Sequence, residues 1–400
     1  NFYFVFPTQF TGASFTWEQV KLEEVVEITM GQSPSSKNYT NNSSDHILVQ
    51  GNADMKNGHV EPRVWTTQIT KQAKKGDLIL SVRAPVGDIG KTDYDVVIGR
   101  GVAAIKGNEY IFQVLIKMKD SGYWTRFSTG STFESINSSN IRNAQIMIPK
   151  DDEQTKIAKV LTFLDNTIQL HERKCEELAL IKKALLQKLF PKKDEFKPEV
   201  RYKNFSDAWE QRKLGEILSD LYNGQTPSRN VKSYWKSDIP WLTSGELNHG
   251  IVEETIEKIS ESGKKAANLR LIPSGTIVIA ITGLEAPGTR GNCAILGIDT
   301  TVNQSVMALV VKNNIDTQFI FQWYKKIGEE YGIRYTQGTK QQSYNYDLVK
   351  ILPITIPTTT EEQQKIGSFF NQLDSLIALH QRKLEKLKQL KKFLLQNMFI

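Results

Sequence analysis

Cysteine is scarce in this sequence, which has 2 cysteines in 400 residues. Cys175 and Cys293 are too few for a four-cysteine zinc site or a disulfide framework, so we expect reduced thiols. Long apolar runs are missing too: no stretch of about 18 or more apolar residues occurs, which excludes a membrane-spanning helix. The first ten residues are apolar but lack the basic leader of a signal peptide. These features predict a cytoplasmic protein without membrane attachment.

Motifs that mark catalytic sites are also missing. The sequence contains no G-x-x-x-x-G-K-[ST] phosphate loop, no strand-anchored G-x-G-x-x-G, no H-E-x-x-H and no G-x-S-x-G. It lacks the Asn-Pro-Pro-aromatic or Asp-Pro-Pro-Tyr run expected of an adenine methyltransferase, and its 5 histidines show no metal-ligand spacing. We therefore expect a non-catalytic chain that holds no cofactor and no metal. Paired carboxylates from distant parts of the sequence remain an open alternative.

The composition is that of a globular protein, with 39% hydrophobic and 24% charged residues. A length of 400 residues favours two or three domains. The net charge of +7 admits an anionic partner such as a nucleic acid. A mildly basic protein without such a partner fits equally well, because only the grouping of basic residues on one surface would decide.

The sequence contains an internal duplication. Residues 152–190 and 361–399 align without a gap, and 19 of their 39 positions are identical. Shorter segments ahead of them recur in the same order, for example residues 31–35 and 224–228. The chain therefore repeats one arrangement, in which a globular domain is followed by a long helix.

Both copies of the repeat carry a helical pattern. Their seam positions recur at alternating steps of four and three residues, as in a coiled coil. At 1.5 Å per residue, such a segment would form a rod of roughly 58 Å. We expect the two helices to pair antiparallel; the alternative is that each packs on its own domain. The seam positions are Ile157, Leu161, Leu164, Ile168, His171, Cys175, Leu178, Lys182, Leu185 and Leu189, and Ile366, Phe370, Leu373, Ile377, His380, Leu384, Leu387, Lys391, Leu394 and Met398.

Polar residues occupy equivalent positions in the two seams. His171 matches His380, and Lys182 matches Lys391. Polar residues at seam positions fix the register of paired helices, and we expect this role for both pairs. The lysine stems can also lie along the apolar surface. For the histidines, a ligand site or a switch is the alternative.

The two globular segments mix strands with helices, so the predicted fold class is α+β with a pseudo-twofold internal repeat. Strands are predicted at residues 78–82, 96–98, 277–281 and 307–311, and helices at 109–120 and 316–331. Pro191 is expected to end the first long helix. The predicted division is a first domain at 1–150, a first helix at 151–190, a charged linker at 191–204, a second domain at 205–358 and a second helix at 359–400.

Both domains carry polar loops suited to nucleic-acid contact. Gln and Asn pair bidentately with adenine edges, and Arg and Lys with guanine or phosphate. Hydroxyl groups and glycine amides add phosphate contacts. Such loops are often ordinary turns, but these recur at matching positions in two divergent domains. The candidate DNA-binding residues are Gln32, Ser33, Ser35, Lys37, Tyr39, Arg83, Arg100, Ser131, Thr132 and Asn140 in the first domain, and Gln225, Thr226, Ser228, Arg229, Lys232, Trp235, Thr243, Ser244, Arg290, Thr339, Lys340, Gln341, Gln342 and Tyr344 in the second.

This order of elements resembles the DNA-specificity subunit of a type I restriction–modification system, which has two target-recognition domains and two repeated helical segments. The resemblance covers nearly the whole chain, although the first domain departs more from the pattern and has a short lead-in. It rests on Trp-Glu-Gln-Arg-Lys-Leu-Gly at 209–215, Gly-Gln-Thr-Pro-Ser at 224–228, Ile-Pro-Trp-Leu-Thr-Ser-Gly at 239–245 and the twin Glu-Gln-x-Lys-Ile helix starts at 153–157 and 362–366.

The resemblance implies a non-catalytic subunit that binds double-stranded DNA, with each domain reading one half of an asymmetric bipartite site. It implies that the paired helices set the unread spacer between the half-sites. The implied partners are two methyltransferase (modification) subunits and two restriction subunits, whose complex methylates adenine and cleaves DNA with ATP. S-adenosylmethionine, ATP and Mg²⁺ would belong to those partners.

Other functions remain open alternatives. One is the specificity subunit of a two-subunit restriction enzyme whose nuclease and methylase are fused. Another is a stand-alone sequence-specific endonuclease, which would need carboxylates and Mg²⁺. A purely structural coiled-coil adaptor would bind no DNA and would lack the steep salt dependence of phosphate binding.

Overall fold

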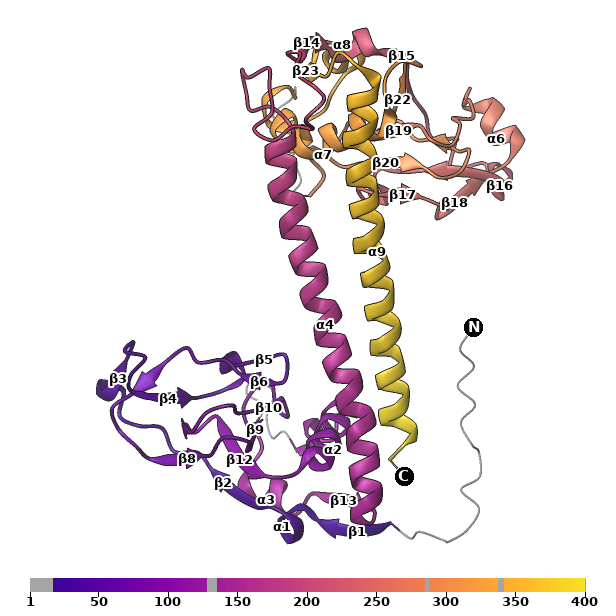
Figure 1. The fold of residues 1–400 in the computed structure, drawn as a ribbon. Coiled ribbons are helices and arrows are strands. Elements are labelled where there is room, and N and C mark those ends of the chain that lie inside the picture. The colour runs from indigo at the N-terminus through magenta and orange to yellow at the C-terminus, as the bar shows by residue number, and fades with distance from the viewer. Residues whose placement is uncertain (1–16, 128–134, 285–287, 337–341, 400) are drawn as a thin grey trace. The chain divides into compact units, whose positions relative to one another are not determined.

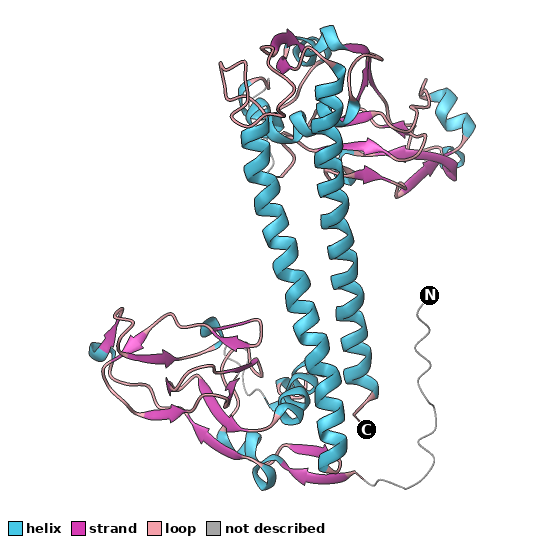
Figure 2. Cartoon of the chain, viewed as in Figure 1, coloured by secondary structure: helices cyan, strands magenta, loops and turns pink. Residues whose placement is uncertain are grey.

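The computed structural model describes residues 17–127, 135–284, 288–336 and 342–399. By their contacts the residues divide into two units, whose elements are drawn in Figure 1 and coloured by secondary structure in Figure 2. Of the described residues, unit 1 comprises those up to residue 173 together with residues 382–399, and unit 2 comprises those from 174 to 381. Each unit therefore contains one sheet-rich domain and a part of both long helices.

The strands of unit 1 form several sheets, and one of them, β9 (Leu78–Ser81), is buried on both faces. They are β1 (Glu18–Lys21), β2 (Glu27–Met30), β3 (Tyr39–Thr40), β4 (His46–Val49), β5 (Met55–Lys56), β6 (His59–Val60), β7 (Trp65–Thr66), β8 (Lys71–Ala73), β9 (Leu78–Ser81), β10 (Ile89–Lys91), β11 (Val96–Ile98), β12 (Val102–Lys106) and β13 (Gln145–Ile148). One sheet has the order β2-β12-β9-β10-β6-β5 and another the order β3-β7-β4-β11-β8, while β1 pairs with β13. In β9, Leu78 and Leu80 join one core cluster and Ile79 joins another, as the alternation of strand side chains requires.

The strands of unit 2 form the corresponding sheets. They are β14 (Glu210–Lys213), β15 (Leu218–Asn223), β16 (Trp235–Leu242), β17 (Ile251–Val252), β18 (Glu257–Ile259), β19 (Ile277–Ala280), β20 (Cys293–Leu296), β21 (Thr301–Val302), β22 (Val306–Val311) and β23 (Pro353–Ile356). Their orders are β15-β22-β19-β20-β17, β18-β16-β21 and β14-β23. The strands β9, β11, β19 and β22 confirm the four predicted from apolar runs.

The helices are α1 (Leu22–Val25), α2 (Glu109–Asp120), α3 (Ser138–Arg142), α4 (Asp151–Leu189), α5 (Leu214–Ile217), α6 (Glu261–Ala266), α7 (Thr317–Arg334), α8 (Tyr346–Ile351) and α9 (Thr360–Asn397). The helix α2 begins after Asn108, whose side chain accepts the Ile111 N–H at 3.0 Å. Asp316 caps α7 in the same way. Both helices were predicted from the sequence, and α4 ends two residues before Pro191.

The predicted seams of α4 and α9 are covered. Every seam position is buried or half-buried. In unit 1, Leu161 and Leu164 of α4 lie in one core cluster with Leu394 of α9. In unit 2, Leu189 of α4 shares a cluster with Phe370 of α9. The long helices therefore pack together within each unit as well as on the domains.

The helix segments of unit 1 run antiparallel. Asp165 of α4 forms an ion pair of 2.5 Å with Lys391 of α9. Glu172, later on α4, forms an ion pair of 2.7 Å with Lys388, which precedes Lys391 on α9. The contact order is therefore reversed between the two helices, as predicted.

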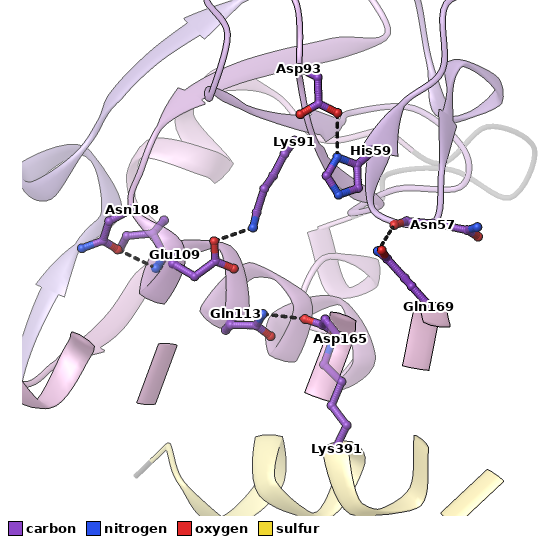
Figure 3. A network of polar contacts seen from close by, with 11 residues as sticks. Asn57, His59, Lys91, Asp93, Asn108, Glu109, Gln113, Asp165, Gln169 and Lys391 are labelled. Atoms are coloured by element: carbon purple, nitrogen blue, oxygen red, sulfur yellow. Dashed lines mark hydrogen bonds and ion pairs between the residues drawn. The ribbon is translucent and has the colours of Figure 1, made fainter. Parts of the chain in front are cut away.

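A carboxylate joins the domain of unit 1 to both helices, as Figure 3 shows. Asp165 accepts a hydrogen bond of 2.8 Å from Gln113 of α2 and also pairs with Lys391. The side chains of Asp165 and Lys391 are only 24% and 16% exposed, so water screens their attraction incompletely. Gln113, Asp165 and Lys391 together are termed the first junction.

Unit 2 repeats this arrangement with the equivalent residues, which lie 209 positions away in each case. Gln322 of α7 donates to Asp374 of α9 at 2.9 Å, and Lys182 of α4 pairs with the other carboxylate oxygen. These three residues are termed the second junction. Lys325 adds another ion pair to Asp374 at 3.2 Å, where unit 1 has Ile116. The seam lysines therefore end in ion pairs between the helices.

Aromatic clusters dock the C-terminal end of one long helix on each domain. In unit 1 the end of α9 reaches the domain, and in unit 2 the end of α4 does. A tryptophan directly precedes the first strand of each unit, and its ring contacts two other aromatic rings. The centroid distances are 6.2 and 6.3 Å in unit 1 and 5.6 and 6.2 Å in unit 2. The clusters are Trp17, Tyr110 and Phe399 in unit 1, and Trp209, Phe319 and Phe190 in unit 2.

The α+β fold class, the internal repeat and the packing of the two long helices are thus confirmed. The domain boundaries stay a prediction. Among the described residues, no helix is long and apolar enough to cross a membrane.

Replacing Lys391 with methionine leaves the Asp165 carboxylate partly buried with Gln113 as its remaining junction partner. Lys391→Met is expected to lower the free energy of unfolding by about 1–3 kcal/mol, because a partly buried charge loses its counter-charge. Urea unfolding followed by circular dichroism measures this loss.

Lys182→Met is expected to cost less, because Asp374 keeps its ion pair with Lys325. Lys392→Met, on an exposed position next to the junction lysine, is the matched control and should change stability by less than about 0.5 kcal/mol. Equal losses for the junction and control variants would contradict the role given to the first junction.

Candidate nucleic-acid interface

The Gly-Gln-Ser-Pro-Ser loop of unit 1 begins with a close backbone approach. A Cβ on Gly31 would lie 2.0 Å from the Gly99 carbonyl oxygen, so only glycine fits. The Ser33 hydroxyl then accepts the Arg100 N–H at 3.0 Å. The loop at residues 31–35 is thereby fixed against the segment that follows β11, and the Arg100 side chain is exposed.

A further loop of unit 1 meets the same segment. The Gln50 side chain lies beside Gly99, and its carbonyl accepts a hydrogen bond of 3.2 Å from the Tyr39 hydroxyl. The Gln50 N–H donates to Asp54 at 2.7 Å. The Gln68 side chain accepts the Ser35 N–H at 2.9 Å. Side chains of the candidate set are therefore brought together with two glutamines that the sequence did not single out.

Unit 2 places the equivalent loop against the equivalent segment, with different hydrogen bonds. A Cβ on Gly224 would lie 1.6 Å from the Val302 carbonyl oxygen. The Thr226 hydroxyl donates to the exposed Gln304 side chain at 2.5 Å. The Trp241 indole donates to the Gln225 carbonyl at 3.1 Å. Thr226 and Gln304 thus occupy the places of Ser33 and Arg100.

The loop after β16 corresponds to the Gln50 loop of unit 1. The Thr243 N–H and hydroxyl donate to the Glu246 carboxylate at 2.8 and 2.7 Å. Glu246 also accepts the Ile256 N–H at 2.7 Å. This loop is held by a carboxylate three residues on, and its Thr243 and Ser244 are half-buried.

Arg229 is held in a rigid cluster. Its guanidinium makes two hydrogen bonds to Glu257, at 2.5 and 2.8 Å, and lies 3.6 Å from the ring centroid of Trp235. The hydrogen bonds that Arg229 donates to Glu257 raise the pKa of Arg229 above its ordinary value. The Trp235 indole donates to the Ser228 carbonyl at 3.1 Å. Arg229 therefore organises this loop, and Glu257 balances its charge.

The remaining candidates of unit 1 have different surroundings. Gln32 and Lys37 are exposed, and Arg83 is exposed at an isolated bridge with Ser135. Asn140 belongs to the capping box of α3. The candidates Ser131 and Thr132 lie outside the described residues.

The remaining candidates of unit 2 differ in exposure. Lys232 is exposed. Arg290 is half-buried and donates to Gln342 at 3.0 Å. Tyr344 is 3% exposed and packs in the core, so the interface proposed below leaves it out. The candidates Thr339, Lys340 and Gln341 lie outside the described residues.

Several residues of these loop clusters gave no signal in the sequence. Gln304 had one available clue, because it follows β21 as Arg100 follows β11. The residues that the structure adds are Gln50, Gln68, Glu246, Glu257 and Gln304. Within the described parts of the chain, no group of three or more His, Cys, Asp or Glu residues could hold a metal ion.

Comparison with known proteins identifies the family. The family described as type I restriction modification DNA specificity domain matches residues 15–180 and 206–389. The chain belongs to this family. It is a DNA-specificity subunit of the type I restriction–modification kind, itself non-catalytic.

Individual relatives agree with the family assignment. The chain is 25% identical over 296 residues to the type I restriction enzyme MjaIX specificity subunit of Methanocaldococcus jannaschii, which covers 69% of this chain and 68% of that one. It is 26% identical over 169 residues to the EcoR124I/EcoR124II specificity subunit of Escherichia coli, which covers 42% of this chain. The match spans only 41% of the length of that relative.

A solved structure shares the fold. The crystal structure of the type I restriction–modification system S subunit from M. genitalium aligns with a TM-score of 0.70 over 98% of both chains, at 14% sequence identity. At this identity the likeness concerns the fold, which is the α+β arrangement described above.

Arg100 provides a test of the loop cluster in unit 1, because its side chain is exposed while its backbone holds the loop. Arg100→Met is expected to weaken binding of the specificity subunit to its target duplex about tenfold and to relax the base preference at one position of the half-site. Fluorescence anisotropy with the target duplex and with duplexes substituted at single positions measures both. Lys159→Met, at an exposed position of α4, is the control; an equal effect of that variant would contradict a local DNA contact.

Proposed function

We propose that each domain of this specificity subunit reads one half of an asymmetric bipartite duplex site. The observation that carries this proposal is the pair of equivalent loop clusters with different contents. Both are built on a glycine that admits a backbone carbonyl, at Gly31 and Gly224. The side chains presented beside them differ: Arg100 stands in unit 1 where Gln304 stands in unit 2.

Those side chains suit different bases. Arginine pairs bidentately with guanine O6 and N7, whereas glutamine pairs with adenine N6 and N7. Each such contact provides about 1–3 kcal/mol of discrimination. Hydroxyl groups such as those of Ser35 and Ser228, both exposed, would add contacts to the phosphate backbone. Different side chains at equivalent places would make the two half-sites different.

The long helices would set the number of unread base pairs between the half-sites. The helix α4 contains 39 residues and α9 contains 38, which corresponds to roughly 58 Å at 1.5 Å per residue. One turn of DNA spans about 34–36 Å. Helices of this length suit half-sites that are one to two turns apart, and the seam and the junctions would keep that separation constant.

The repeated outer surface of the helices would bind the catalytic partners. Arg173 and Lys174 on α4 recur as Arg382 and Lys383 on α9, and all four are exposed. Two copies of one surface suit two copies of one partner. We propose two methyltransferase subunits and two restriction subunits as partners, with S-adenosylmethionine, ATP and Mg²⁺ held by them.

Exchange of one domain should alter one half-site. Replacing residues 14–150 with the corresponding domain of another specificity subunit is expected to change the half-site read by unit 1 and to leave the other unchanged. Mapping methylated adenines in a genome where the chimera is expressed with its methyltransferase measures the outcome. Simultaneous change of both half-sites would contradict independent reading.

Lengthening both helices should lengthen the spacer. Seven residues add about 10.5 Å of helix, so a heptad inserted into both α4 and α9 at matching seam positions is expected to increase the spacer by about three base pairs at 3.4 Å per step. The same methylation mapping measures the spacer. An insertion that leaves the spacer unchanged while the protein stays folded would rule out the proposed role of the helices.

A further inference from the structure

A pocket in unit 2 lies against the second junction. Its volume is about 570 Å³. Its walls come from α4, α7 and α9, from His249 and from the segment at residues 288–292. The pocket is therefore built within one unit from both long helices and from the domain.

Cations outnumber carboxylates in this pocket. Lys182, Lys183, Lys325 and Arg290 line it together with the carboxylates of Asp374 and Glu329. The Lys182 and Lys325 side chains are only 11% and 13% exposed, and both pair with Asp374. Two poorly hydrated ammonium groups thus share one carboxylate, which leaves positive charge uncompensated at a partly buried place.

The ionisation of the junction reflects this excess. Burial, followed by the charge of Lys325, lowers the pKa of Lys182 to about 8. Burial opposes ionisation of Asp374, but the charges of Lys325 and Lys182 hold the pKa of the carboxyl below its ordinary value. The Asp374 carboxylate is therefore ionised, and Lys182 shares its negative charge with Lys325.

The first junction shows that the seam does not need the additional lysine. Lys391 pairs with Asp165 there, and Ile116 stands where unit 2 has Lys325. Arg290 is a second feature of the pocket: its Nε is buried and has no hydrogen-bond partner among the described residues. A buried donor without a partner is unfavourable unless something else accepts its hydrogen bond.

We propose that this pocket binds a phosphate-sized oxyanion. A phosphate group accepts charge-assisted hydrogen bonds from several cations at once and supplies the missing negative charge. The group comes either from the DNA backbone, in which case the inference rests on the proposed function, or from free phosphate in solution. The competing explanation is that Lys325 has only a structural role, because its ammonium also donates to the backbone carbonyl of His249 at 2.7 Å and so fixes the position of that residue.

The test measures thermal stabilisation of the full-length chain by inorganic phosphate, with sodium chloride at matched ionic strength as reference. Lys183→Gln removes an exposed pocket cation and leaves Asp374 untouched, while Lys325→Ile installs the residue of unit 1. Each variant is expected to weaken phosphate affinity about tenfold. Lys392→Gln is the matched control, because Lys392 is the repeat equivalent of Lys183 and belongs to unit 1; it should behave as the parent chain.

The outcomes separate the explanations. Phosphate stabilisation no greater than that of chloride, or an equal loss in Lys392→Gln, would overturn the proposal. If Lys325→Ile does not fold, the comparison of Lys183→Gln with Lys392→Gln still decides. DNA that abolishes the phosphate effect, with a DNA affinity that falls about tenfold in Lys183→Gln, identifies the backbone as the source. Phosphate binding that persists beside bound DNA identifies free phosphate, and it leaves the proposed function intact.

Discussion

A carboxylate shared between two partners determines how the elements of each unit fit together. Asp165 binds a glutamine of the domain and a lysine of the opposite helix, and Asp374 does the same. Ion pairs with little exposure contribute small net stability, because desolvation offsets attraction, but a misplaced carboxylate left without its lysine is costly. The junctions therefore select one arrangement of α2 or α7, α4 and α9 from the many that apolar seams alone would allow.

The junctions also select the relative direction of the two long helices. Parallel helices in the register of the repeat would place Asp165 against Asp374 and Lys182 against Lys391, whereas antiparallel helices place unlike charges together.

The same constraint extends to the interface. Gln113 and Gln322 lie on α2 and α7, which pack against the central strands, so each junction orients a whole domain. The loop clusters follow β2, β4 and β11 in unit 1 and β15, β16 and β21 in unit 2, and they depend on backbone approaches at Gly31 and Gly224 that no other residue would permit. The positions of the loops are thus fixed by backbone and junction contacts, while the side chains they present are free to differ. This division explains how one fold, used twice in a chain, can serve two half-sites of different sequence.

The sequence predicted what local patterns encode and missed what distant contacts decide. Helical periodicity and the duplication specified α4, α9 and the seam, because heptads repeat along one stretch of chain. The role of the seam lysines was predicted only as fixing register, since their acidic partners lie on the other helix. The hydroxyl contacts of Ser33 and Thr226 join residues 67 and 78 positions apart, which no motif reveals. Tyr344 was placed among loop candidates by composition, yet it is buried because the sheet and α7 enclose its ring.

Duplication explains why the two junctions differ. Each half must keep a glutamine, an aspartate and a lysine, because loss of any one would disturb both the domain and the helix pair. A neighbouring position is not constrained in this way, and its residue differs between the units: it is Ile116 in unit 1 and Lys325 in unit 2. A lysine added beside an existing ion pair is electrostatically unfavourable unless another anion compensates it, since Lys182 and Lys325 repel each other across Asp374. A lysine that adds positive charge beside an existing ion pair, and that the other unit does without, is better explained by binding than by folding.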